Sequence, residues 1–375
     1  MFTPFQIDIP QDAIEDLRVR LQATRWPRSL AGDWERGVPV GYLRGVVERW
    51  LEFDWRAWEA RLNAVPQYTT RIETQTVHFL HARSPEPAAV PLLLTHGWPG
   101  SVAEFLEVLG PLTDPRRYGG DAADAFHVVA PSVPGHGFSV PLEEPGWDHA
   151  RIARAWVELM DRLGYARYGA QGGDTGSVVS PLVGRLAPDR VIGVHINGGL
   201  AFPAAEPGDF DDLNETDRAK LATAQHIRAT GTGYAVLQST KPQTVSFALS
   251  DSPVGQLAWI LEKFHDWTDP ARPLPEDAVA LDHLLADVSI YWFTNTSATS
   301  ANLYYESRPV EQAVGPSGVP TGVAVFPTDP AMRHILEREH HITHWTEYSQ
   351  GGHFAALEAP NLLVKDIRAF FRELR

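Results

Sequence analysis

The sequence contains no cysteine, and this absence removes several functional classes. A chain without cysteine has no disulfide, no thiolate nucleophile and no cysteine-based zinc site. The sequence is also short of basic residues, with 32 Lys and Arg against 47 Asp and Glu, which gives a formal net charge of −15. Because binding to a polyanion requires a concentrated basic surface, nucleic acid is not expected as a partner. A neutral or apolar small molecule fits this charge better.

Long apolar runs are missing as well. No segment approaches the roughly 18 uninterrupted apolar residues of a membrane-spanning helix, and the opening MFTPFQIDIP lacks the basic and apolar regions of a signal peptide. We therefore expect a cytoplasmic protein with no membrane partner. The chain has 43% apolar and 21% charged residues, which is typical of globular proteins. Its 375 residues suffice for one large catalytic core with an accessory domain.

The order of elements along the chain predicts an α/β fold. Several short, continuously apolar runs are typical of strands buried on both faces, as in a parallel sheet. These expected strands are 76–82, 90–95, 126–130, 165–170, 191–196, 322–326 and 343–348. Helical stretches at 150–163, from about residue 177 and at 360–374 alternate with them. This alternation favours a doubly wound, mostly parallel core.

The chain divides into four expected regions. Residues 1–62 are expected to form a tryptophan-rich N-terminal helical region, and residues 63–200 the first part of the core. Residues 201–310 are mainly helical, which predicts a lid inserted into the sheet. Residues 311–375 complete the core. The N-terminal region can pack on its own core or on a second copy, so a homo-oligomer is compatible with the sequence.

The strongest local signal is the segment 172–176, GGDTG, between an expected strand and an expected helix. Small residues on both sides of a central nucleophile are typical of a nucleophile elbow, in which glycines permit a sharp turn that lifts one side chain above the sheet. Here that side chain is the carboxylate of Asp174. The same residues are compatible with an ordinary loop whose aspartate caps the helix. The choice between a nucleophile elbow and such a loop therefore depends on other segments of the chain.

Three further segments follow strands in the order that such a site requires. Residues 96–101 (HGWPGS) follow the strand at 90–95, where a loop can supply an oxyanion-hole amide. Asp329 comes just after the strand at 322–326, and His353 lies between the last strand and the last helix. Nucleophile, acid and histidine in this order are typical of α/β-hydrolases.

An aspartate nucleophile restricts the chemistry. It is ionised at neutral pH, and its attack on a saturated carbon forms an alkyl ester, which suits strained ethers and alkyl halides. We expect His353, oriented by Asp329, to activate the water that hydrolyses this ester. The backbone amides of Trp98 and Thr175 are expected to stabilise the oxyanion. No cofactor and no metal are expected.

Several motifs together resemble the microsomal-type epoxide hydrolases. They are HGWPG (96–100), QGGD (171–174) and GGHFAA (351–356) in the core, TRWP (24–27) and FDWR (53–56) near the N-terminus, and STKP (239–242) and DSPVG (251–255) in the lid. The resemblance covers almost the whole chain. It implies an α/β-hydrolase core with a helical lid and conversion of an epoxide to a vicinal diol. Thr175 departs from the tryptophan that many members have there, and no membrane anchor like that of the mammalian members is expected.

The resemblance also implies two lid tyrosines that protonate the alkoxide formed on ring opening. Tyr234 and Tyr304 match those positions, with Tyr305 as the competing assignment for Tyr304. A phenol with a pKa near about 10 is a suitable donor to an alkoxide. The expected protein is an epoxide hydrolase whose partners are a small-molecule epoxide and water, with detoxification among its compatible roles.

Two other functions are compatible with these residues. A haloalkane dehalogenase would use the same three side chains, with Trp98 as an N–H donor to the halide. A catalytically silent α/β-hydrolase would bind a ligand without turning it over. An esterase is disfavoured because the elbow holds aspartate rather than serine. His340 and His344 have a helical metal-ligand spacing, but the expected change from helix to strand disrupts that geometry.

Overall fold

The computed structural model describes residues 1–30, 32–199, 208, 210–307 and 317–375. Its strands form one sheet, which is antiparallel at one edge and parallel from β5 onward. In spatial order they are β1 (Thr3–Phe5), β2 (Gln67–Ile72), β3 (Gln75–Ala82), β5 (Phe126–Pro131), β4 (Val90–Thr95), β6 (Tyr168–Gly173), β7 (Val191–Asn197), β8 (Pro320–Val325) and β9 (His341–Glu347). The predicted α/β architecture with a mostly parallel sheet is confirmed.

The antiparallel edge is where the structure differs most from the sequence-based expectation. Residues 1–62 contain the expected helices, but a short strand, β1, precedes them, and the sequence does not predict it. β1 pairs with β2, which the sequence patterns did not indicate, and Thr3 lies opposite Thr69. A three-residue strand carries almost no periodic signal of its own. Its formation depends on backbone pairing with a partner far along the chain.

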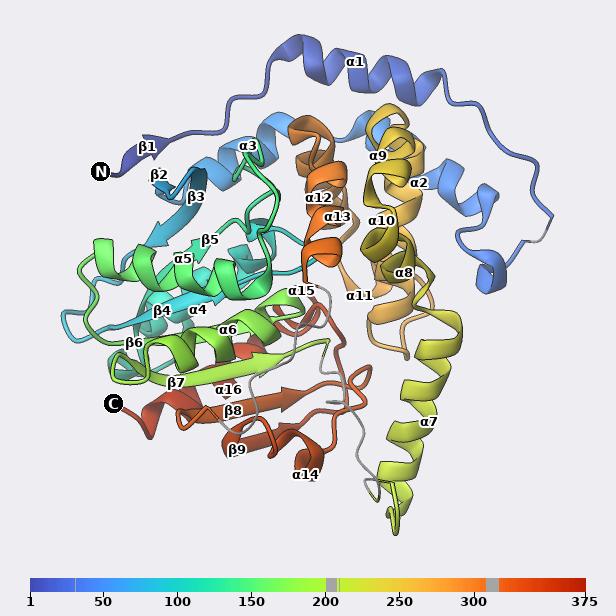
Figure 1. The fold of residues 1–375 in the computed structure, drawn as a ribbon. Helices are drawn as coiled ribbons and strands as arrows, with labels where there is room; N and C mark the ends of the chain where they lie inside the picture. Colours follow the sequence, from blue (N-terminus) through green and yellow to red (C-terminus); the bar gives the residue numbers. More distant parts are fainter. Residues whose placement is uncertain (31, 200–207, 209, 308–316) are drawn as a thin grey trace.

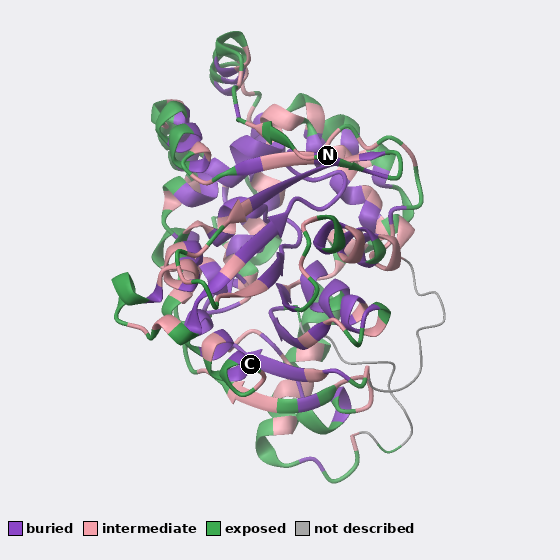
Figure 2. Ribbon diagram, turned by 90° about the vertical axis from the view of Figure 1, so that its left-hand side faces the viewer, coloured by how far each residue is buried: buried purple, intermediate pink, exposed green. Residues whose placement is uncertain are grey.

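Helices cover both faces of the parallel strands (Figure 1). One face carries α5 (His149–Arg162) and α6 (Thr175–Leu186), and the other carries α4 (Leu106–Thr113) and α16 (Pro360–Arg372). In α5, Ile152, Trp156 and Leu159 follow a helical period and are fully buried. Burying each such side chain contributes roughly 1.5–3 kcal/mol. Figure 2 shows the strands mostly buried between helices whose outer sides are exposed.

A helical insertion, the lid, separates β7 from β8. It contains α7 (Glu215–Thr230), α8 (Gly233–Thr240), α9 (Pro242–Asp251), α10 (Pro253–Trp267), α11 (Pro275–Ala278), α12 (Leu281–Thr294) and α13 (Thr296–Glu306). The expected limits of the lid, at residues 200–201 and 310–311, lie outside the described residues. Shorter elements are the 3-10 turns η1 (Trp34–Arg36), η2 (Val102–Phe105), η3 (Pro115–Tyr118) and η4 (Ala122–Asp124) and the helices α14 (Arg333–Leu336) and α15 (Ala355–Glu358). Within the described ranges, no helix combines the length and apolar character that a membrane span needs.

The N-terminal helices pack mainly on the lid (Figure 1). They are α1 (Gln11–Gln22), α2 (Val40–Glu52) and α3 (Trp55–Asn63). Leu21 and Trp50 join one apolar cluster with Leu257 of α10 and Leu284 of α12. The indole Nε1 of Trp50 also donates a hydrogen bond to Ser289 Oγ at 2.9 Å. Helices α1 and α2 therefore pack directly against α10 and α12 of the lid.

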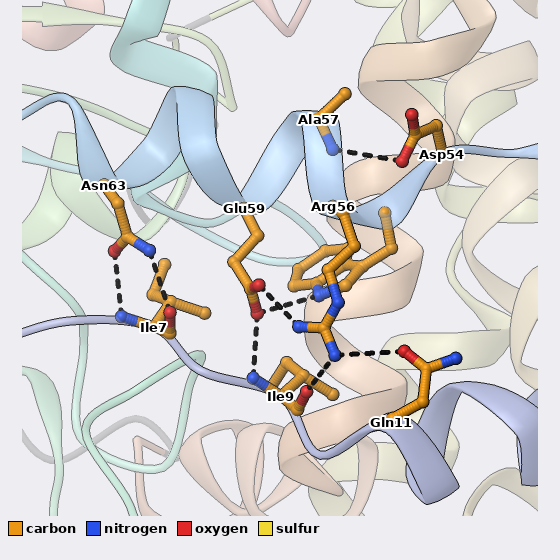
Figure 3. Close-up of polar contacts among 9 residues, drawn as sticks. Ile7, Ile9, Gln11, Asp54, Arg56, Ala57, Glu59 and Asn63 are labelled. Carbon is orange, nitrogen blue, oxygen red and sulfur yellow. Dashed lines mark hydrogen bonds and ion pairs between the residues drawn. The ribbon is translucent and has the colours of Figure 1, made fainter.

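The segment between β1 and α1 is tied to α3 through its backbone (Figure 3). Ile7 N donates to Asn63 Oδ1, and Asn63 Nδ2 donates back to Ile7 O, both at 2.8 Å. Ile9 N donates to Glu59 Oε1 at 2.8 Å, and Arg56 donates to Ile9 O at 2.7 Å. These side chains satisfy backbone groups that have no strand or helix partner. We call Arg56, Glu59 and Asn63 the clamp, because together they fix the irregular segment between β1 and α1.

This clamp leads to a prediction about stability. Asn63→Ala removes both hydrogen bonds to Ile7, whose side chain is 3% exposed, and is expected to lower the free energy of unfolding by about 1–3 kcal/mol. Urea unfolding measures the change. Gln11→Ala, which removes two exposed 3.3 Å contacts, one with Arg56 and one with Glu15, is the control and is expected to have little effect. Equal stability of the two variants would contradict a stabilising role for the clamp.

Candidate active site

Asp174 lies at the sharp turn between β6 and α6, where the sequence predicts an elbow. Its backbone has φ 53° and ψ −119°, a region that non-glycine residues rarely adopt and that costs on the order of 1–3 kcal/mol. The flanking glycines make the turn possible. A Cβ on Gly172 would lie 2.6 Å from the Gly176 Cα, and a Cβ on Gly176 would lie 2.1 Å from the Thr95 carbonyl oxygen. The turn therefore brings β6, α6 and β4 closer together than side chains permit.

The two carboxylate oxygens of Asp174 have different surroundings. Oδ1 accepts hydrogen bonds from the backbone amides of Trp98, at 2.9 Å, and of Thr175, at 2.7 Å. Gly97 allows this position, because a Cβ there would lie 2.1 Å from Oδ1. These are the two amides that the sequence predicts for the oxyanion hole. They hold Oδ1 and leave Oδ2 as the oxygen that can attack.

His353 faces Oδ2 from the loop between β9 and α15. Its Nε2 lies 3.4 Å from Asp174 Oδ2, and its backbone amide donates to the Trp267 carbonyl at 2.8 Å. Burial lowers the pKa of His353, but the contact with Asp174 and the charges of Asp329 and Glu358 outweigh it and raise the pKa above its usual value. For Asp174, burial raises the pKa, but His353 and the two amides lower it below its usual value. The resting site therefore favours an ion pair.

Two acids lie near His353. Asp329, in the loop after β8, is buried, its Oδ2 accepts a hydrogen bond from Phe326 N at 3.2 Å, and its charge contributes to the raised pKa of His353. Glu358, at the end of α15, accepts hydrogen bonds from Phe354 N and Asp269 N. Burial raises the pKa of Glu358 to about 7. The structure thus brings the predicted acid to the predicted histidine and adds a second acid that the sequence patterns did not indicate.

Tyr234 of α8 and Tyr304 of α13 meet above Trp98. The Tyr234 ring stacks on the indole with centroids 5.0 Å apart, and the Tyr304 ring lies 5.9 Å from the same indole. The two tyrosine rings are 5.7 Å apart. Burial and the charge of Asp174 raise the pKa of Tyr234, and burial, Tyr234 and Asp174 raise that of Tyr304. Both phenols are therefore protonated at neutral pH. Tyr305, the competing assignment for Tyr304, is 43% exposed.

The glycine pair after β7 completes the base of the site. The carbonyl of Gly198 accepts a hydrogen bond from Asp174 N at 2.9 Å. A Cβ on Gly199 would lie 3.2 Å from the Asp174 Cα and 3.3 Å from His353 Cε1. Both glycines have positive φ. The sequence analysis did not identify this pair as part of the site, although adjacent glycines after a strand are a signal of close backbone approach.

Lys263 of α10 is a further buried residue beside the site. Its side chain is 3% exposed, and its Nζ lies 4.7 Å from the centre of the Tyr234 ring and 5.6 Å from that of Trp267. A cation over an aromatic ring is attracted by its π electrons. The same Nζ pairs with Glu262 Oε1 at 2.5 Å. Lys263 thus contacts both aromatic residues from α10, and no motif in the sequence indicated it.

The histidines with a helical metal-ligand spacing lie apart from the catalytic residues. His340 precedes β9 and His344 lies within it, so the two do not share a helix face. His344 Nε2 pairs with Asp366 Oδ1 at 3.1 Å, and His195 pairs with the same oxygen at 2.8 Å. Among the residues that the structure describes, no group of three potential ligands is placed to hold a metal ion.

Comparisons with known proteins agree with this geometry. Residues 2–105 match the family described as "Epoxide hydrolase N terminus", and residues 90–360 match the "alpha/beta hydrolase fold". A protein of Stigmatella aurantiaca provisionally named as an epoxide hydrolase is 48% identical over 100% of this chain and 85% of its own. Epoxide hydrolase 1 of Sus scrofa is 34% identical over 98% of this chain and 88% of its own. The structure of Aspergillus niger epoxide hydrolase is 34% identical, covers 100% of this chain and 97% of its own, and has a TM-score of 0.88.

Proposed function

This chain belongs to the epoxide hydrolases of the α/β-hydrolase fold, and from that premise we propose that it converts an epoxide to a vicinal diol through a covalent ester on Asp174. The observation that carries the proposal is the asymmetric environment of the Asp174 carboxylate. Oδ1 is held by two backbone amides, while Oδ2 faces His353. A carboxylate that is ionised, with one oxygen hydrogen-bonded and the other oriented for attack, is a nucleophile that needs no base.

The first step is ring opening. Oδ2 of Asp174 forms a bond to one epoxide carbon, and the bond between that carbon and the epoxide oxygen breaks. The electron pair moves to the oxygen, and a proton from Tyr234 or Tyr304 neutralises it. In a buried site an unprotonated alkoxide would be strongly disfavoured. The paired phenols above Trp98 are the groups placed to supply this proton.

The second step is hydrolysis of the ester. His353 takes one proton from water, and the hydroxide adds to Cγ of Asp174, so that the negative charge develops on Oδ1 between the amides of Trp98 and Thr175. Collapse breaks the bond between Cγ and Oδ2, and Oδ2 leaves in the diol with the proton held by His353. The remaining water proton returns to the tyrosine. Asp174 regains its carboxylate with one oxygen from water.

Alkylation also changes the proton affinity of His353, and this gives a pH prediction. In the free enzyme the hydrogen bond and charge of Asp174 raise the pKa of His353. The neutral ester removes that charge, so burial lowers the pKa of His353 against only the remaining charges of Asp329 and Glu358. His353 then loses its proton and becomes a base. We expect the hydrolysis rate to fall as the pH drops through a pKa below that of His353 in the free enzyme. Single-turnover kinetics from pH 5 to 9, with NMR titration of free His353, measure both values, and a higher value in the ester would contradict the scheme.

The tyrosines are expected to affect ring opening only. Tyr234→Phe and Tyr304→Phe each remove one of two proton donors. Each should slow alkylation by about 10- to 100-fold, less than the 10²–10⁴-fold that general acid catalysis typically contributes, because the other phenol remains. Rapid-quench detection of the ester measures this rate. Tyr305→Phe is the matched control, because that side chain is 43% exposed, and it should alkylate at the wild-type rate. Unchanged alkylation in both Tyr234→Phe and Tyr304→Phe would overturn their assignment.

The test of the function itself is turnover on a mixed panel of aryl epoxides, alkyl epoxides and haloalkanes. The proposal predicts diol formation from epoxides and no halide release. Halide release without diol would instead support the haloalkane dehalogenase alternative. Absence of both products across the panel would support a catalytically silent binding protein.

A further inference from the structure

A small cavity lies beside Asp174 and His353. It is lined by both of these residues and by Gly100 and Glu104, whereas Tyr234 and Tyr304 do not border it. The cavity has a volume of about 20 Å³, and one ordered water molecule needs roughly 10–15 Å³. The cavity is therefore large enough for a water molecule next to the carbonyl carbon that hydrolysis must attack.

Glu104 is the acidic side chain in this cavity that the mechanism above does not use. It lies in η2, four residues after Gly100, and a Cβ on Gly100 would lie 2.2 Å from Glu104 Oε2. The backbone of Gly100 is itself held by α12, because the Tyr291 hydroxyl donates a hydrogen bond to the Gly100 carbonyl at 2.9 Å. Among the described residues, no protein group hydrogen-bonds to the Glu104 carboxyl. Glu104 is partly buried and lines the cavity, so a carboxyl without a protein partner there takes water as its hydrogen-bond partner.

We propose that Glu104 positions the water that hydrolyses the Asp174 ester. This inference rests on the two-step function proposed above. The attacking water has two hydrogens, and His353 removes only one. A carboxyl oxygen of Glu104 accepts a hydrogen bond from the other, which turns a lone pair of the water toward Cγ of Asp174. Glu104 is thus a positioning residue for the second step.

The protonation state of Glu104 is consistent with this role. Burial, followed by the charges of Asp287 and Asp174, raises the pKa of Glu104 well above its usual range. A neutral carboxyl keeps an oxygen that accepts a hydrogen bond, but it does not compete with His353 for the proton. It also places no second negative charge near Asp174 while the oxyanion forms. The neighbouring Asp287, itself buried, helps to keep Glu104 neutral.

The inference predicts a selective effect on hydrolysis. Glu104→Met, similar in size but without a hydrogen-bonding oxygen, should slow ester hydrolysis by about tenfold or more, the effect of losing one hydrogen bond at a reacting group. Its alkylation rate should stay within about twofold of wild type. Glu104→Gln keeps an acceptor oxygen in the same place and should retain most of the hydrolysis rate. Stopped-flow fluorescence of Trp98 and Trp267, which lie 6.2 Å apart in the site, follows both steps with an aryl epoxide.

Controls separate this inference from the proposal on which it rests. Glu104→Ala provides a second variant without the acceptor, in case Glu104→Met does not fold, and thermal unfolding checks each variant. Hydrolysis at the wild-type rate in the folded apolar variant, or equal slowing of both steps, would overturn the role of Glu104. His353→Gln is measured in parallel. If it forms no ester, the two-step function fails, whereas ester formation there with wild-type hydrolysis in Glu104→Met overturns only the inference about Glu104.

Discussion

Asp174→Ala is expected to lose essentially all diol formation, with turnover at least about 10⁴-fold below wild type, as for removal of other catalytic nucleophiles. The variant keeps the oxyanion-hole amides and His353 but has no atom that can attack the epoxide carbon. The fold should survive. Alanine keeps the Cβ that the elbow already accommodates at position 174.

The measurement is diol formation from an aryl epoxide, with circular dichroism and thermal unfolding to confirm the native state. Asp174→Asn is the matched control for shape, because it keeps an oxygen that can accept from the Trp98 and Thr175 amides but lacks the charge. Both variants should be inactive. Retention of more than about 1% of wild-type turnover in folded Asp174→Ala would mean that water attacks the epoxide directly.

His353→Gln is expected to separate the two steps. Asp174 is ionised without help from a base, so alkylation should proceed at a rate close to wild type. Hydrolysis of the ester loses its base and should fall by about 10²–10⁴-fold, the usual contribution of general base catalysis. The enzyme should therefore stop after one turnover as a stoichiometric covalent adduct.

Intact mass spectrometry detects this adduct, and peptide mapping assigns it to Asp174. His341→Gln is the matched control, because His341 lies exposed in β9, and it should turn over normally without accumulating an adduct. If His353→Gln gives diol at the wild-type rate, or never gains mass, then His353 is not the base for ester hydrolysis.

The parts of the site that local sequence shows are those in which a turn requires particular residues. The elbow at Asp174 is visible because close contacts at Gly172 and Gly176 exclude any side chain there. The placement of Asp329 and His353 after strands is visible because the carboxyl ends of parallel strands meet at one edge of the sheet. Their approach to Asp174 in space follows from the strand order.

The spacing of small residues before the two tyrosines also distinguishes Tyr304 from Tyr305. Ser297, Ser300, Ala301 and Tyr304 recur at the three- and four-residue spacing of one helix face, and the first three are buried in α13. Small residues let that face approach the core closely. Tyr305, one residue after Tyr304, therefore lies off that helix face and is 43% exposed.

Other features depend on contacts that sequence patterns do not carry. β1 forms through pairing with β2, and the N-terminal helices pack on the lid because α10 and α12 expose an apolar face to them. Glu104 and Glu358 look like ordinary acidic residues of short helical turns. Only their positions beside the cavity and beside His353 single them out.

The covalent ester is the central claim, and single turnover in H₂¹⁸O with enzyme in excess over an aryl epoxide tests it most directly. The account predicts that the first diol carries unlabelled oxygen from Asp174 Oδ2, and that the peptide containing Asp174 gains one ¹⁸O. Diol labelled in the first turnover, with Asp174 unlabelled, would show direct attack of water on the epoxide and would contradict the account.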